Sequence, residues 1–131
     1  MDAGSPSAPH FPQAAPIDAY GNGGFRFAGM SHRGSLLCLP SGMYAWGVTQ
    51  PSELTLASLA PVLEVADAID VLFIGFGQDI AALDPAIRPA FRERNVIVEA
   101  VATRGAVSTY NILLAEQRPV AAALIAVERA R

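Results

Sequence analysis

The feature that most constrains the fold of this chain is an apolar run that ends abruptly in glycines. Residues 71–74 read Val-Leu-Phe-Ile and are followed at once by Gly75-Phe76-Gly77-Gln78-Asp79. A short apolar run bounded by turn residues is typical of a strand buried on both faces of an α/β sheet. Ligands of such sheets bind at the carboxyl ends of the strands. The pattern therefore predicts a parallel strand and, just after it, the candidate ligand-binding residues Gly75, Gly77, Gln78 and Asp79.

The loop after this strand begins like a dinucleotide-binding fingerprint but lacks the rest of it. Ile80 stands where the third glycine belongs, and the loop runs to Asp84 before a helix is expected. A pyrophosphate would then not rest on the helix N-terminus as the motif requires. The two glycines are explained by a sharp turn and need no dinucleotide-binding role. We therefore expect no cofactor. The chain also shows no triad, and Asp84 is expected to cap a helix, so we predict no catalytic residue.

Composition favours one globular domain and disfavours nucleic-acid binding. The chain has 131 residues, of which 52% are hydrophobic and 16% charged, and its net charge is −3. A nonspecific nucleic-acid binder needs a basic stripe, whereas here nine basic residues are scattered among twelve acidic ones. All nine are arginine. The absence of lysine excludes Schiff-base chemistry and a Walker lysine.

Cysteine, histidine and hydropathy patterns narrow the expectations further. Cys38 is the single cysteine, which excludes an intrachain disulfide and a cysteine-based zinc site and agrees with a reducing compartment. His10 and His32 have no ligand spacing, so no metal site is expected. The N-terminus lacks a signal-peptide pattern, and residues 120–127 are too few to span a bilayer. We therefore expect a cytoplasmic protein without direct membrane insertion.

The order of apolar segments predicts a mixed-sheet α/β sandwich. Residues 1–16 are rich in proline and alanine and are expected to be a flexible tail, residues 17–127 a single domain, and residues 128–131 a C-terminal tail. In the first half, we expect a hairpin around residues 21–24, strands at 35–39 and 43–48, and a helix over 54–63 that Pro61 shortens or bends.

The second half alternates strands and helices. Strands are predicted at 70–76, 96–101 and 119–127, and the first two are expected to be buried. Asp84 is expected to cap one helix that ends at a left-handed Asn95, and Thr103 to cap another that runs to about residue 116. N-terminal antiparallel strands followed by β-α-β-α-β predict a sheet that is parallel in its second half.

The start of the last helix carries unusual polar residues, for which two explanations stay open. Ser108 and Asn111 are three apart and share a face, and Thr109 and Asn111 lower helix propensity. Such residues serve either a buried hydrogen-bond network or a ligand. For the second case, the candidate ligand-binding residues on this helix are Thr103, Arg104, Ser108, Thr109 and Asn111.

Several of these segments together carry a family resemblance. They are Ile17-Asp18-Ala19-Tyr20, Gly24-Phe25, residues 36–40, Trp46, Gly75-Phe76-Gly77, Thr103, Ala106, Thr109-Tyr110-Asn111 and residues 120–125. The set resembles the small α/β family that contains mitochondrial NADH dehydrogenase (complex I) assembly factor 3 and bacterial relatives of unknown function. The resemblance covers about residues 17–127. It implies a compact three-layer α/β fold around a mixed β-sheet, no established catalytic residues, and a binding or assembly role.

Two principal functional hypotheses follow. The first is a non-catalytic binding or assembly protein that holds an unidentified protein partner, such as an assembly intermediate of a membrane complex. The alternative is an enzyme or sensor for a small anionic ligand, held between Gly77, Gln78 and the N-terminus of the Thr103 helix. In a third case the cleft is vestigial and the domain acts through oligomer contacts alone. The oligomeric state does not follow from the sequence.

Overall fold

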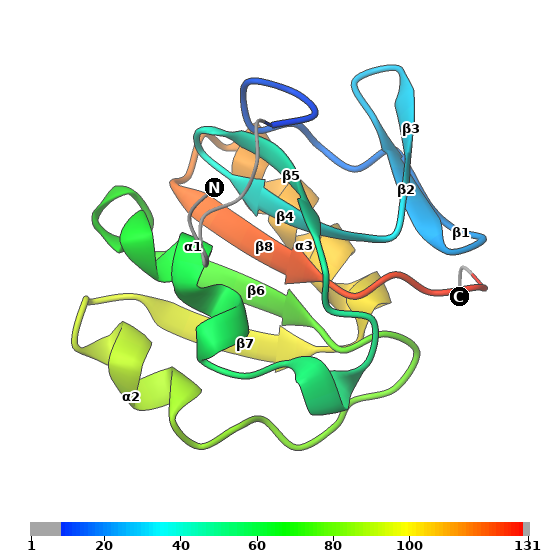
Figure 1. The fold of residues 1–131 in the computed structure, drawn as a ribbon. Coiled ribbons are helices and arrows are strands. Elements are labelled where there is room, and N and C mark those ends of the chain that lie inside the picture. The colour runs from blue at the N-terminus through cyan, green and yellow to red at the C-terminus, as the bar shows by residue number, and fades with distance from the viewer. Residues whose placement is uncertain (1–8, 130–131) are drawn as a thin grey trace.

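A computed structural model describes residues 9–129 of the chain and places most of them in an α/β domain (Figure 1). Within these residues the strands are β1 (Ala19–Gly21), β2 (Gly24–Phe27), β3 (Met30–Arg33), β4 (Ser35–Leu39), β5 (Gly42–Trp46), β6 (Val71–Gly75), β7 (Ile97–Val101) and β8 (Val120–Leu124). The α-helices are α1 (Ala60–Glu64), α2 (Ile87–Arg92) and α3 (Thr103–Ala115). None of these helices is long and apolar enough to cross a membrane.

The main sheet is mixed, as predicted. Its five strands lie in the order β5-β4-β8-β6-β7. β6 pairs in parallel with both β7 and β8, so that Val71 lies opposite Ile97 on one side and Val120 on the other. β4 is antiparallel to β5 and to β8. The apolar run at 71–74 therefore forms a strand with a neighbour on each side, which explains its continuous hydrophobicity.

The first three strands form a separate antiparallel sheet in the order β1-β2-β3. The predicted hairpin is confirmed: Asn22 and Gly23 have φ values of 53° and 77°, which suit a two-residue turn between paired strands. The small sheet is joined to the segment that follows β8, because the Gly23 N–H donates to Val127 O at 2.8 Å.

Helical layers cover both faces of the main sheet, which gives the three-layer fold that the resemblance implies. On one face, Leu59, Val62, Ile87 and Phe91 pack against the sheet from α1, α2 and the turn before α1. On the other face, α3 and the small sheet pack against it. Their buried side chains are Phe25, Phe27, Ala106, Val107 and Tyr110. Figure 1 shows α1 and α3 on opposite sides of the sheet.

The helix predicted over 54–63 is wrong in extent. The chain forms short 3-10 turns at Pro51–Glu53 and Ala57–Leu59, and α-helix only from Ala60 to Glu64. Pro61 occupies the second position of α1, where its missing N–H has no partner to lose. Proline therefore starts this helix instead of bending it.

The α2 helix starts later than predicted and ends as predicted. Asp84 does not cap it; its carboxylate accepts a hydrogen bond from the Ala86 N–H at 3.0 Å and forms a turn before the helix. Asn95 has a φ of 64°, and the Val96 N–H donates to Phe91 O at 2.9 Å. This combination is the Schellman ending that the asparagine indicated.

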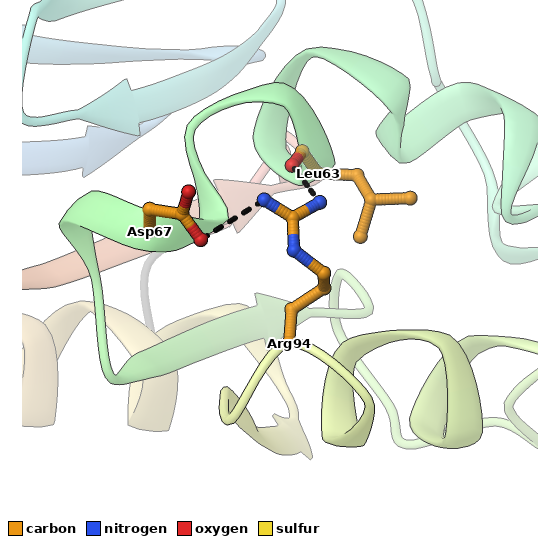
Figure 2. Close-up of polar contacts among 3 residues, drawn as sticks. All are labelled: Leu63, Asp67 and Arg94. Atoms are coloured by element: carbon orange, nitrogen blue, oxygen red, sulfur yellow. Dashed lines mark hydrogen bonds and ion pairs between the residues drawn. The ribbon is translucent and has the colours of Figure 1, made fainter.

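Arg94, just after α2, joins this helix to the α1 region (Figure 2). Its guanidinium donates to Asp67 Oδ1 at 3.0 Å and to Leu63 O at 3.4 Å. The Asp67 side chain is 90% exposed, so the ion pair contributes well under about 1 kcal/mol. The contact positions the end of α2 more than it stabilises the fold.

The N-terminal segment is held against the domain from residue 10 onward. Residues 1–8 of the predicted flexible tail lie outside the described residues. Phe11 pairs with Met43, and the His10 N–H donates to Met43 O at 2.8 Å. Ala15 is buried, and its carbonyl accepts a hydrogen bond from the Tyr110 hydroxyl at 3.0 Å. Composition alone did not indicate these attachments, because the donors and acceptors come from remote strands and from α3.

Candidate functional site

The predicted glycine loop and the start of α3 meet directly. Gly75 ends β6, and a Cβ atom at this position would lie 2.8 Å from the Thr103 Cα. That separation is shorter than non-bonded carbon atoms tolerate. Glycine is thus required here because the helix packs onto the strand end, which agrees with the sequence-based expectation that the two segments converge.

Thr103 joins three elements through its buried hydroxyl. The hydroxyl donates to Ile125 O at 2.7 Å and accepts from the Gly77 N–H at 3.0 Å, while the Thr103 N–H donates to Gly77 O at 2.9 Å. The predicted capping role is wrong: Ala102, with extended φ and ψ of −65° and 154°, is the N-cap. Thr103 is the first helical residue, and its hydroxyl bonds to the loop after β6 and to the residue after β8.

These hydrogen bonds bear on the predicted anion site between Gly77, Gln78 and the helix N-terminus. The N–H groups of Gly77 and Thr103 are already paired within the protein. An anion bound by these two N–H groups would have to break those pairs. The helix end would offset little of that loss, because it offers only about 0.3–1 kcal/mol per exposed charge. The structure therefore does not support the anionic-ligand alternative at this position.

Gly77 is buried and has a φ of 103°, a conformation that favours glycine. The loop residues that follow it lie at the surface. Gln78 is exposed, and its side-chain oxygen accepts from the Arg129 N–H at 3.3 Å. Asp79 is exposed, and Ile80 beside it keeps 67% of its surface accessible.

On one side of α3, three of the predicted residues border a hollow of about 490 Å³. Arg104, Ser108 and Asn111 form its helical wall, and residues 17–20 form the other. The Asn111 amide donates to Ile17 O and accepts from the Ile17 N–H, both at 2.8 Å. Of the two explanations left open for Asn111, the structure thus displays an internal network: Asn111 holds the N-terminal segment as a neighbouring strand would.

Thr109 lies on the opposite side of α3, in a second hollow of about 410 Å³. Gly105, Thr109 and Leu113 line it from the helix, and residues of β6 and β7 line it from the sheet. The residues predicted to share one cleft are therefore divided between two sides of the helix.

The second hollow contains strand residues that no sequence motif indicated. The strand at 96–101 was predicted to be buried, but Ile97 and Glu99 are exposed while Val96 and Val98 are buried. The available signal was a period of two along the strand, in which Ile97, Glu99 and Val101 alternate with Val96, Val98 and Ala100. One glutamate in an otherwise apolar strand was too weak a departure to show which face lacks a cover.

The titratable groups that the structure perturbs most are internal. Burial raises the pKa of the Cys38 thiol, and likewise that of the Tyr110 hydroxyl, well above their ordinary values. Both pack in the core between the main sheet and α3. Among residues 9–129, no group of three or more His, Cys, Asp or Glu side chains is arranged to hold a metal ion.

Fold and surface together define a small α/β domain with a mixed sheet, in which a single helix separates two surface hollows. The chain belongs to the family described as "Protein of unknown function (DUF498/DUF598)", whose model matches residues 17–125. This match covers nearly the whole of the domain predicted from the sequence.

Individual relatives agree with the resemblance seen in the sequence. An uncharacterized protein of Rhodobacter capsulatus is 37% identical over 121 residues, covering 92% of each chain. NADH dehydrogenase [ubiquinone] 1 alpha subcomplex assembly factor 3 of Mus musculus is 33% identical over 115 residues. The match covers 88% of this chain but only 62% of the mouse protein. A solved structure from Bartonella henselae, described as an outer membrane protein, has a TM-score of 0.87 and 51% identity, covering 91% of this chain and 100% of that one.

Proposed function

We propose that this protein is a non-catalytic binding factor that assists the assembly of NADH dehydrogenase by holding a protein partner. The observation that carries the proposal is the 33% identity to assembly factor 3 over 88% of this chain. Because the chain spans 62% of that relative's length, the role of the whole relative is extended here to the shared domain.

The chemistry of the domain supports binding over catalysis. The Thr103 hydroxyl and the Asn111 amide, the polar groups with the most distinctive placement, are engaged with backbone atoms of the protein itself. They stabilise the domain because a buried polar group left unpaired costs about 1–3 kcal/mol. Exposed apolar side chains beside α3 are the kind of surface that protein partners cover.

We include the exposed polar residues of the predicted site in the partner-facing surface. Arg104 and Ser108 flank the hollow beside residues 17–20, and Gln78 and Asp79 lie on the glycine loop. None of the four is buried, so each is available to the rim of an interface, where polar side chains predominate.

Deletion of the gene in its host tests the proposal. We expect membranes of the deletion strain to contain less assembled NADH dehydrogenase on native gels, and the wild-type chain to restore it. Tagged protein, recovered separately from cytosol and membranes, should co-purify with a subunit of that complex. Normal assembly without the protein, together with recovery of no subunit above a surface-scrambled variant, would contradict the proposal. The same fractions test the expected cytoplasmic location.

A further inference from the structure

One face of the edge strand β7 lacks the cover that a parallel sheet normally has. β7 is the last strand of the main sheet beside β6, and α3 packs chiefly over β6 and β8 (Figure 1). On the α3 side, Ile97 keeps 60% of its surface accessible. Parallel strands are usually buried on both faces. The exposed face of β7 is therefore a place where another element fits.

The uncovered face and α3 together form a groove, here called the β7 groove. It is the hollow of about 410 Å³, lined by Val71, Phe73, Ile97, Glu99, Val101, Gly105, Thr109 and Leu113. Its helical wall is low because Gly105 has no side chain and Thr109 a short one. Ile112 is 56% exposed and lies three residues from Thr109, on the same helical face. One exposed isoleucine, Ile97, therefore lines the groove itself, and a second, Ile112, lies on the helix outside its lining.

We propose that the β7 groove binds an amphipathic helix of another protein, with a basic side chain opposite Glu99. Glu99 is the only charged residue that lines the groove. Its carboxylate has no ion-pair or hydrogen-bond partner among residues 9–129. Covering a carboxylate is costly unless a cation accompanies it. A helix with an apolar face and one lysine or arginine covers the apolar floor of the groove and pairs with the Glu99 carboxylate. This inference rests on the proposed protein-binding function and specifies the partner segment.

A helix in the groove fits better than a strand added to the sheet edge. The Arg88 guanidinium donates to the Val98 carbonyl. In a parallel pair, a residue directs its N–H and its C=O to the same neighbouring strand. The Ile97 N–H points toward β6, because it donates to the Asp70 carbonyl just before that strand. Val98 therefore faces outward, and Arg88 occupies the acceptor that an added strand would need. The free apolar surface is the face of β7, which suits the helix-in-groove mode of recognition.

Two other occupants fit less well. In a symmetric dimer through this groove, two concave surfaces would meet and place Glu99 near its own copy, which is electrostatically unfavourable. Residues 1–8 read Met-Asp-Ala-Gly-Ser-Pro-Ser-Ala and carry one large apolar side chain, too few for an amphipathic helical face. They also precede His10, which is bonded to β5 at the opposite edge of the sheet.

The test uses the full chain and two labelled helical peptides of about 15 residues, long enough to form a helix. One peptide has a leucine face and lysine on the other positions, and the second has glutamate in place of lysine. Fluorescence anisotropy measures binding. We expect the lysine peptide to bind and Ile97→Asp to weaken it by at least about tenfold. Ile80→Asp, the same change at an exposed isoleucine outside the groove, should leave it unchanged.

Glu99→Lys provides the sharper test, because it should reverse the preference and favour the glutamate peptide. Equal binding of the lysine peptide to wild type, Ile97→Asp and Glu99→Lys overturns the proposal. So does a concentration-dependent dimer in analytical ultracentrifugation that Ile97→Asp abolishes, since the occupant would then be a second copy. Both positions are exposed, and thermal unfolding verifies that each variant is folded.

The same variants in the deletion strain separate this inference from the proposed function. If wild type restores NADH dehydrogenase assembly and Ile97→Asp restores it equally well, the groove proposal is wrong and the assembly role stands. If wild type itself has no effect on assembly, the proposed function fails. Loss of assembly with Ile97→Asp is the result we expect.

Discussion

The Thr103 hydroxyl holds the end of β6, the start of α3 and the end of β8 together. We predict that Thr103→Val destabilises the protein by about 2–4 kcal/mol, because it leaves the buried Gly77 N–H and Ile125 carbonyl without partners. Thr103→Ser keeps the hydroxyl and should cost about 1 kcal/mol for the lost methyl group. Urea unfolding measures both. A valine variant as stable as the serine variant would show that the hydroxyl is not needed.

Asn111 acts on the N-terminal segment through a pair of hydrogen bonds to one residue. We predict that Asn111→Leu, which removes both bonds to Ile17, speeds amide hydrogen exchange at Ile17 by about tenfold or more. Ser108→Ala lies one turn earlier at an exposed position and serves as the matched control. Unchanged exchange at Ile17 in the leucine variant would mean that Tyr110 and the Phe11 pairing hold the segment without Asn111.

At the level of elements, two glycines beside α3 have opposite roles. Gly105 lies within the helix, and a Cβ there would meet Val101 Cγ2 at 3.5 Å, an ordinary contact. Gly105→Ala should therefore stabilise the protein by up to about 1 kcal/mol through helix propensity. Gly75→Ala should destabilise it by about 1–3 kcal/mol, because its Cβ would meet the Thr103 backbone at 2.8 Å. Thermal unfolding of the two variants should shift in opposite directions, and a stabilising Gly75→Ala would contradict the packing described.

The elements that were predicted well are those specified by local signals. The apolar run at 71–74, the left-handed Asn95 and the turn around Asn22 each depend on neighbouring residues, and each appears as expected. Errors occur where the partner is remote. Thr103 looks like a cap, but its hydroxyl bonds to Gly77 and Ile125, which are 26 and 22 residues away.

The same distinction explains how much of the candidate site was predictable. The convergence of Gly75, Gly77 and Thr103 follows from parallel strands that end at one sheet edge. That Asn111 binds Ile17 across 94 residues does not follow from any local pattern. The division of Ser108 and Thr109 between two hollows depends on the rotation of α3 over the sheet, which is set by packing of its buried face.

At the scale of the whole molecule, the core between the sheet and α3 makes the free energy of unfolding depend on pH in the alkaline range. Burial raises the pKa of the Cys38 thiol, so the folded state keeps the proton while the unfolded chain loses it above about pH 8.5. The folded state then binds more protons, and the free energy of unfolding falls as pH rises. This contribution is fully present below about pH 8.5 and is lost above it, by up to about 1.4 kcal/mol per pH unit.

The composition of the chain makes this effect easy to isolate. It contains no lysine, so between about pH 8.5 and pH 9.5, below the ordinary pKa of tyrosine, few other groups change charge. We predict that urea unfolding midpoints of the wild type fall over this range and that Cys38→Ala, although less stable at neutral pH, shows a flatter dependence. The alanine variant loses stability at neutral pH because it leaves a small cavity beside Tyr110. Parallel pH profiles for the two proteins would show that the thiol stays protonated in both states or ionises in both, and that its burial does not control the alkaline limit.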